Sequence, residues 1–189
     1  MEANSKIISV PVFNAIKSKN WDEFKHLILD KDYKGRYMIE KRIIDIITIT
    51  YSVNENFDII FSIISKRDDF DINATETIYY MTGMMFLLNN CAYVVFDNGT
   101  NLITKNFLIF FNNGADINKK NRFGETALHI AARSNYYQVV KILLNSNRMN
   151  TLLTNNANKT AYSVALDKYC KESVNEFHLY SEKRKYMYS

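Results

Sequence analysis

The hydrophobic residues of this chain recur at the spacing of short amphipathic helices. The pattern is clearest in residues 121–144, NRFGETALHIAARSNYYQVVKILL, where the apolar side chains that follow Thr126 fall on one stripe of a helix. Thr is a favoured N-cap residue, so a first helix is predicted over 127–133. A second, broader apolar stripe predicts another helix over 137–144.

Residues typical of turns stand before and between these two helices. Phe123-Gly124 predicts a tight turn ahead of the first helix. Asn135 tolerates a positive φ better than other non-glycine residues, so it predicts the connection between the helices. Upstream, residues 114–118 read Gly-Ala-Asp-Ile-Asn and predict a further turn. The segment is therefore predicted to be a helix–turn–helix unit.

The pattern of the second helix returns along the chain at a nearly fixed spacing. It occurs at 21–29, 58–64, 105–111, 137–144 and 173–178. Equivalent ends at Leu29, Ile64, Phe111, Leu144 and His178 are separated by 35, 47, 33 and 34 residues. First helices are predicted at 12–18, 39–51, 83–96, 127–133 and 161–167. Recurrence of one such unit predicts an all-α solenoid.

The unit at 121–144 resembles the ankyrin repeat. The family pattern G-x-T-P-L-H-x-A-A-x-x-G-x-x-x-V-V-x-x-L-L is matched except at Ala127, where the family has Pro, and at Asn135, where it has Gly. The G-A-D-x-N turn of the family is matched at 114–118. The resemblance implies one domain over 1–189 with about five repeats, namely 8–36, 37–73, 74–118, 119–153 and 154–182, followed by a basic tail at 183–189.

Three parts of the chain depart from a regular repeat. The separation of 47 residues predicts an insertion in the third unit, with an overlong helix over 83–96 and a turn at 97–100. The inserted residues could serve packing or binding. Residues 47–51 alternate as in a strand although they lie in a predicted helix. The tail at 183–189 is expected to fray or to dock another molecule.

The composition fits a helical intracellular protein. Hydrophobic residues make up 47% of the chain, and five Gly and one Pro are too few for an all-β sandwich. No signal peptide or membrane-spanning segment is predicted, and Cys91 and Cys170 lack a metal or disulfide spacing, so an intracellular and cytoplasmic location is expected, with the nucleus as an alternative. Abundant Asn, Ile, Lys, Tyr and Phe suggest an A/T-rich genome, as in large DNA viruses or intracellular microbes.

The residues that could carry chemistry form no recognisable site. His26, His129 and His178 are the only histidines, and none stands in a catalytic or zinc-binding pattern. The glycines are isolated, unlike those of phosphate-binding loops. We therefore expect neither enzymatic activity nor a metal or other cofactor. The ankyrin resemblance implies that His129 hydrogen-bonds with Thr126 and ties neighbouring turns together.

The resemblance implies a binding surface on the concave side, formed by turn tips and first helices. Cations beside an aromatic residue favour protein interfaces, as do Tyr and Arg. The residues predicted to bind a protein are Lys119, Lys120, Arg122, Phe123, Arg133, Tyr136 and Tyr137. Two of them have structural alternatives, since Phe123 could stack on a neighbouring tip and Tyr136 could pack between repeats.

The predicted function is that of a protein-interaction module, monomeric and without catalysis. Short ankyrin proteins of viruses and intracellular microbes often act as inhibitors or adaptors on host signalling proteins, and some resemble inhibitors of NF-κB-type transcription factors. A net charge of +4 is mild for a nucleic-acid binder. Nucleic-acid binding would require the predicted cations to join one stripe. A structural segment of a larger assembly is the other alternative.

Overall fold

A computed structural model describes residues 11–29, 45, 47–49, 51–90 and 99–187. Its helices are α2 (Trp21–Leu29), α4 (Phe57–Ile64), α5 (Gly83–Asn90), α6 (Gly99–Asn112), α7 (Ala127–Arg133), α8 (Tyr137–Leu144), α9 (Ala161–Asp167) and α10 (Lys171–Met187), with a 3₁₀ turn η2 (Tyr51–Val53). Residues 11–17 and 47–49 are also helical. Within these described residues, β-pairing is limited to two isolated bridges, Thr75 with Thr82 and Thr154 with Thr160.

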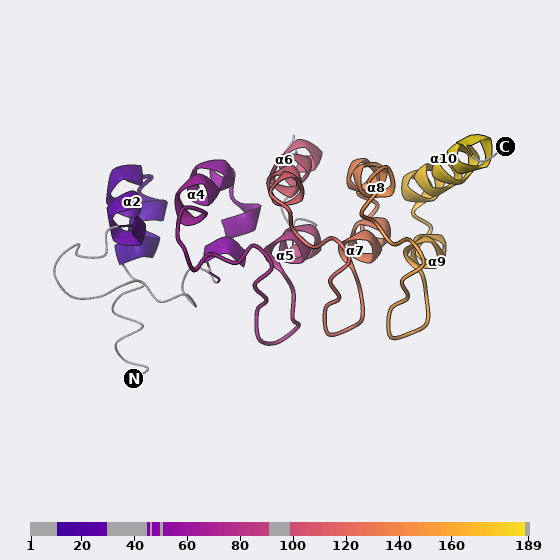
Figure 1. Ribbon diagram of the computed structural model, residues 1–189, viewed down its shortest axis with the longest axis horizontal. Coiled ribbons are helices and arrows are strands. Elements are labelled where there is room, and N and C mark those ends of the chain that lie inside the picture. The colour runs from indigo at the N-terminus through magenta and orange to yellow at the C-terminus, as the bar shows by residue number, and fades with distance from the viewer. Residues whose placement is uncertain (1–10, 30–44, 46, 50, 91–98, 188–189) are drawn as a thin grey trace.

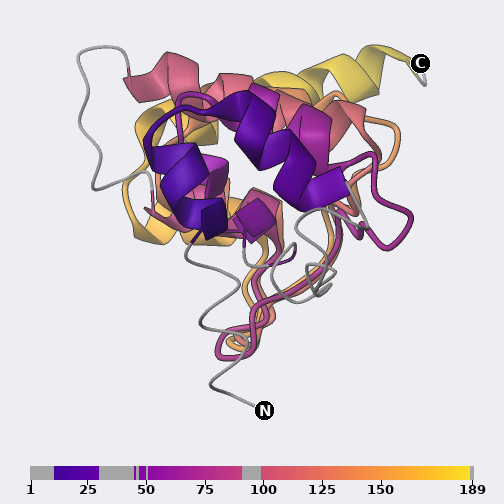
Figure 2. The same ribbon diagram turned by 90° about the vertical axis from the view of Figure 1, so that its left-hand side faces the viewer.

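The helices form two rows along an elongated solenoid (Figure 1). Helices α5, α7 and α9 make one row, and α4, α6, α8 and α10 make the other. Three loops, here called fingers, project from the α5–α7–α9 side: the first finger is 71–82, the second 116–126 and the third 150–160. Viewed along the long axis, the three fingers superimpose, so they stand in line (Figure 2). The all-α repeat architecture predicted from the sequence is confirmed.

Each finger passes into its helix through a threonine. Thr82 Oγ1 accepts from the backbone N–H of Met85, and Thr160 Oγ1 accepts from that of Ser163, both at 3.3 Å. Thr126 occupies the same position before α7, with extended backbone angles. These contacts satisfy N–H groups that have no acceptor within the helix. The start of the first helix at Thr126, predicted from its N-cap preference, is confirmed.

Two clusters of buried side chains run along the solenoid and meet at α4. Ile60 and Ile64 of α4 belong to the cluster that includes Phe24 and Ile28 of α2. Phe57, on the same helix, stacks on Phe110 of α6 at 5.1 Å between ring centroids, within the cluster that extends to α10. Burial of each such side chain contributes about 1.5–3 kcal/mol. Neighbouring repeats are thus held together mainly by apolar contact.

Three local predictions have different outcomes. Gly99 and Thr100 begin α6 and are not a turn, because Gly is tolerated at a helix start, where N–H groups lack intrahelical acceptors. The overlong helix predicted over 83–96 is described only to Asn90, and 91–98 lie outside the described residues. Residues 47–49 are helical, as the predicted helix over 39–51 requires, and do not form the strand that their alternation suggested.

The predicted tail does not form a separate frayed segment, because α10 continues through it to Met187. Arg184 supports this extension by donating to the hydroxyl of Tyr180 at 3.0 Å, with its guanidinium 5.7 Å from the Tyr180 ring centroid. Residues four apart lie on one helix face, which permits this contact. Residues 188 and 189 lie outside the described part of the chain.

Candidate protein-binding groove

A side-chain acceptor folds each finger into a tight loop. Asn121 Oδ1 accepts from the backbone N–H groups of Phe123 and Glu125, each at 2.9 Å. Asn155 makes the equivalent contacts in the third finger at 3.0 and 3.1 Å. In the first finger, Glu76 takes this role and its carboxylate accepts from three backbone N–H groups at 2.6, 2.6 and 3.1 Å. The tips therefore have defined shapes before any partner binds.

The finger tips are also joined to one another through their backbones. The N–H of Arg122 donates to the carbonyl of Tyr79 at 2.8 Å, and the N–H of Asn156 donates to the carbonyl of Phe123 at 3.0 Å. The ring of Phe123 stacks on Tyr79 with centroids 5.9 Å apart. These contacts connect residues more than 30 positions apart in the sequence. They hold the fingers as one rigid row.

A groove of about 890 Å³ lies between the first and second fingers and the helix row behind them. Its apolar lining consists of Ile49, Ile78, Tyr79, Met81, Phe86 and Phe123. Ile78 is 59% exposed and Phe123 49% exposed at the rim. A concave apolar surface with a few fixed polar groups is the usual form of a binding site.

Arg133 fixes the polar side of this groove. Its Nη2 donates to Asn89 Oδ1 of α5 at 2.6 Å, and its Nε donates to Glu125 Oε1 of the second finger at 3.2 Å. The side chains of Arg133 and Glu125 are only 28% and 13% exposed. Partial burial strengthens such charge-assisted hydrogen bonds. Arg133 thereby links α7, α5 and the second finger.

His129 links α7 to the third finger. Its Nδ1 accepts from the backbone N–H of Thr126 at 3.3 Å and lies 2.9 Å from Thr126 Oγ1, while Nε2 lies 3.0 Å from the carbonyl oxygen of Lys159. Burial lowers the pKa of His129. A neutral ring with its proton on Nε2 satisfies all three contacts. The role in tying neighbouring turns together, implied by the ankyrin resemblance, is confirmed.

Comparison with known proteins agrees with this geometry. The profile of the family described as ankyrin repeats, in three copies, matches residues 88–178. Residues 88–178 are thus similar to ankyrin repeats. It is also 32% identical over 91 residues to a protein named I-Kappa-B like protein G2, from Microplitis demolitor bracovirus (isolate Webb). That similarity covers 48% of this chain and 54% of the relative. The second and third fingers lie within the matched residues, and the first finger lies outside them.

The first and second fingers bring two of the residues predicted to bind a protein into the groove. Phe123 and Arg133 both line it. Arg122 lies at the tip beside them, where its Nη1 donates to the carbonyl of Ile78 at 3.3 Å. The expected alternative for Phe123, stacking on a neighbouring tip, is also observed. The ring therefore helps to hold the fingers together, while about half of its surface stays exposed.

The other four predicted residues lie away from the groove lining. Lys119 Nζ donates to the carbonyl of Asn73 at 2.7 Å, and Lys120 Nζ donates to that of Thr154 at 2.8 Å, so each lysine braces a neighbouring finger. Tyr136 is half-buried against the core, as its structural alternative suggested. Tyr137 begins α8, in the helix row opposite the fingers, and is 38% exposed.

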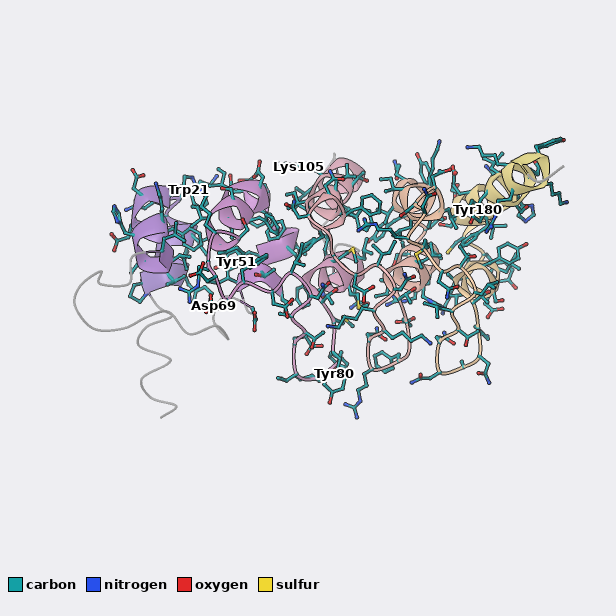
Figure 3. All side chains as sticks on the ribbon, in the orientation of Figure 1. Trp21, Tyr51, Asp69, Tyr80, Lys105 and Tyr180 are labelled. Carbon is teal, nitrogen blue, oxygen red and sulfur yellow. The ribbon has the colours of Figure 1, made fainter. Side chains whose placement is uncertain are left out.

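Sequence reasoning missed the aromatic tip of the first finger. Tyr79 and Tyr80 are 46% and 53% exposed beside Ile78, and Tyr80 stands at the end of the finger (Figure 3). A signal was present, because Asp-Ile-Asn at 71–73 repeats 116–118 at an offset of 45 residues. Extending that alignment would have placed residues 76–80 at a tip equivalent to 121–125.

Other kinds of site are not indicated in the described part of the chain. No cluster of three or more His, Cys, Asp or Glu side chains there could hold a metal ion. Among those same residues, no helix is both long and apolar enough to cross a membrane. Burial raises the pKa of the Cys170 thiol, whose Sγ contacts the carbonyl oxygen of Arg133 at 3.4 Å. A thiol with a raised pKa is a poor nucleophile, which favours a packing role.

Proposed function

We propose that this protein binds another protein in the groove between its first and second fingers and acts, without catalysis, as an inhibitor or adaptor of an intracellular signalling protein. The observation that carries the proposal is the groove of about 890 Å³ with exposed Ile78, Tyr79 and Phe123 at its rim. Aromatic residues beside an apolar hollow are frequent anchors of protein interfaces.

The rigidity of the groove supports binding of a folded or extended protein segment. Backbone hydrogen bonds join the tips, and Arg133 fixes the groove wall through Asn89 and Glu125. A surface that is ordered before binding loses little conformational entropy when a partner docks. The affinity then depends on the exposed anchors at the rim.

The named relative supports the inhibitor part of the proposal. Its name describes an I-Kappa-B like protein, and it comes from a virus, so a viral protein acting on a host signalling partner in the cytoplasm is our favoured setting. The similarity spans about half of each chain. The proposal keeps the division of the chain into five repeats, the first two at 8–36 and 37–73. It also takes a monomer as the unit that binds the partner.

The positions of the cations favour a protein partner over nucleic acid. Lys119 and Lys120 each donate to a backbone carbonyl, and Arg133 is paired with Glu125. Nucleic-acid binding requires cations that are available to replace counterions along a phosphate backbone. The groove also contains the carboxylates of Glu76 and Glu125, which would repel phosphate.

A binding measurement with a matched control tests the proposal. The partner to try first is an NF-κB-type transcription factor, measured by titration calorimetry against the unmodified chain and against Ile78→Ala/Phe123→Ala. Tyr137→Ala/Lys141→Ala is the control, because both residues are exposed on α8, away from the groove. Loss of two interface anchors should weaken binding by roughly 2–4 kcal/mol.

The two variants distinguish binding in the groove from binding elsewhere. Binding that is weakened by the groove variant and retained by the α8 control supports the proposal. Equal binding by both variants would move the site away from the groove. If the transcription factor does not bind, proteins that the unmodified chain captures from host-cell extract are tested for capture by the same two variants. Capture by the groove variant that equals capture by the unmodified chain would reject the proposal.

A further inference from the structure

The tip of the first finger differs from the other two tips in length and composition. Each tip lies between the side chain that closes the loop and the threonine that precedes the next helix. The first tip has five residues at 77–81, whereas the second has four at 122–125 and the third has four at 156–159. The first reads Thr-Ile-Tyr-Tyr-Met, and the others read Arg-Phe-Gly-Glu and Asn-Ala-Asn-Lys. The first tip is therefore longer and richer in large apolar side chains.

Tyr80 stands where the backbone of each tip has a positive φ. The φ angle is +56° at Tyr80, +72° at Gly124 and +57° at Asn158. Gly and Asn are tolerated in this left-handed region, whereas an aromatic residue is disfavoured there. Tyr80 therefore makes the first tip less stable than the residue types found at the other two tips would.

The fold does not require an aromatic residue at this position. The Glu76 carboxylate closes the loop by accepting from backbone N–H groups, as Asn121 does in the second finger. Tyr79 stacks on Phe123, but the ring of Tyr80 stacks on no other ring within the described part of the chain, and 53% of Tyr80 is exposed. An unfavourable backbone conformation that the surrounding contacts do not explain is often found where a residue serves binding.

Tyr80 lies beside the groove but not in its lining. Ile78, Tyr79 and Met81 line the groove, whereas Tyr80, which stands between them in the sequence, does not. Its side chain is at the end of the finger (Figure 3). A segment bound only within the groove would leave Tyr80 exposed. A partner that covers both Tyr80 and the groove must enclose the end of the finger, so its own surface must be hollow there.

The charges of the two joined tips favour a protein over a lipid surface as the occupant. Residues 76–82 and 121–126 carry one cation, Arg122, against two carboxylates, Glu76 and Glu125. Anionic membranes are recognised by clusters of several Lys or Arg residues, which these tips lack. A hollow in a protein provides apolar walls for the ring of Tyr80 and a polar partner for its hydroxyl.

We propose that Tyr80 is a specificity-determining residue of the protein-binding site, and that the partner is a folded protein with an apolar hollow that receives the tip of the first finger. The ring of Tyr80 enters this hollow while Ile78 and Tyr79 contact the part of the partner that lies in the groove. The tip is ordered before binding, so its insertion costs little conformational entropy. The inference rests on the proposed function, because the same partner occupies the groove.

Opposite effects on stability and on binding test the inference. Tyr80→Asn gives the first tip the residue of the third and should raise the Tm by about 2–4 °C, because Asn tolerates the positive φ. It should also weaken binding of the NF-κB-type transcription factor at least about tenfold in titration calorimetry, because an anchor is lost. Tyr169→Asn is the matched control, since Tyr169 also has a φ of +56° and is 87% exposed, but lies between α9 and α10. It should raise the Tm similarly and leave the affinity unchanged.

Three further measurements identify the kind of partner. Tyr80→Phe keeps the ring and should retain most of the affinity, and a loss equal to that of Tyr80→Asn would mean that the ring does not enter an apolar hollow. Overlapping peptides that cover the transcription factor should each bind far more weakly than the folded factor, because only a folded surface provides the hollow. Vesicles of phosphatidylcholine and phosphatidylserine should not sediment the unmodified chain.

The groove variant Ile78→Ala/Phe123→Ala separates failure of the inference from failure of the proposed function. Weaker binding by this variant with unchanged binding by Tyr80→Asn would overturn the inference and leave the proposed function in place. Unchanged binding by both would reject both proposals. An unchanged or lower Tm for Tyr80→Asn, tight binding of a single peptide, or binding to vesicles that requires Tyr80 would also overturn the inference.

A second probe serves if the transcription factor does not bind the unmodified chain. It is a purified protein whose capture from host-cell extract is lost with the groove variant, and the Tyr80→Asn and Tyr169→Asn variants are compared on it in the same way. If no such protein is found, both proposals are rejected.

Discussion

The side-chain oxygen of Asn73 accepts a hydrogen bond from the backbone N–H of Asp116, 2.8 Å away and 43 residues later in the sequence. The next repeat makes the same contact, since Asn118 Oδ1 accepts from the N–H of Asn150 at 2.9 Å while its Nδ2 donates to the carbonyl of Arg148 at 2.7 Å. Asparagine side chains thus form a ladder that joins the bases of successive fingers.

Replacement of one rung should destabilise the solenoid measurably. Asn118→Ala removes both of these side-chain hydrogen bonds, and we expect the free energy of unfolding to fall by about 1–2 kcal/mol. Urea unfolding followed by circular dichroism measures this. Asn145→Ala is the control, because the side chain of Asn145, the C-cap of α8, donates to the carbonyl of Lys141 in the same repeat. An equal effect of both substitutions would show that the ladder has no special role.

The protonation of His129 predicts a pH dependence of stability. Burial lowers its pKa in the folded state below the value of about 6.5 expected when unfolded. The unfolded chain therefore binds the proton first, and the stabilisation present above about pH 6.5 is lost as the pH falls through the lower, folded pKa. Thermal or urea unfolding at pH 7.5 and pH 5.5 should show this loss.

His129→Gln serves as the comparison for this measurement. The variant is expected to be less stable at pH 7.5, because Gln cannot reproduce both contacts with Thr126 and the carbonyl of Lys159. Its stability should also decrease less between pH 7.5 and pH 5.5 than that of the unmodified chain. The same decrease in both proteins would assign the pH dependence to other groups.

Helix boundaries in the matched repeats could be predicted from sequence because they depend on local features. The apolar spacing predicted 127–133, 137–144 and 161–167, with Thr126 as the cap of the first, and the structure has helices with these bounds. The start of α6 at Gly99 was missed, since a glycine near a helix start looks like a turn when its neighbours in space are unknown.

The exposure of the side chains predicted to bind a protein could not be derived from such local features. Tyr136 and Tyr137 are adjacent in sequence, yet one packs against the core and the other is exposed. The environment of Phe123 is set by Tyr79, which comes from another finger. Such contacts depend on how repeats stack, which a single repeat pattern does not contain. The same limit applies to Arg133, whose partners lie on α5 and in the second finger.

The tip of the second finger should tolerate only glycine at position 124. Gly124 has a φ of +72°, and an added Cβ would lie 2.8 Å from the backbone nitrogen of Asn156 in the next finger. Gly124→Ala should therefore reduce stability by about 1–3 kcal/mol through backbone strain and steric overlap. Asn158→Gly is the matched substitution at the third tip, where φ is +57°, and should be close to neutral. Comparable losses in both variants would reject the steric explanation.

Close packing between α5 and α6 predicts a coupling between Gly83 and Phe110. Gly83 takes the position held by Ala127 and Ala161 in later repeats, and a Cβ there would lie 2.7 Å from Phe110 Cζ. Gly83→Ala should lower the free energy of unfolding by about 1–3 kcal/mol, since Phe110 is fully buried and cannot move away freely.

Phe110→Leu opens this space but also loses buried apolar area. In a double-mutant cycle measured by urea unfolding, the loss caused by Gly83→Ala should become smaller when position 110 is Leu. Additive losses would mean that the glycine is required for a reason other than the size of Phe110.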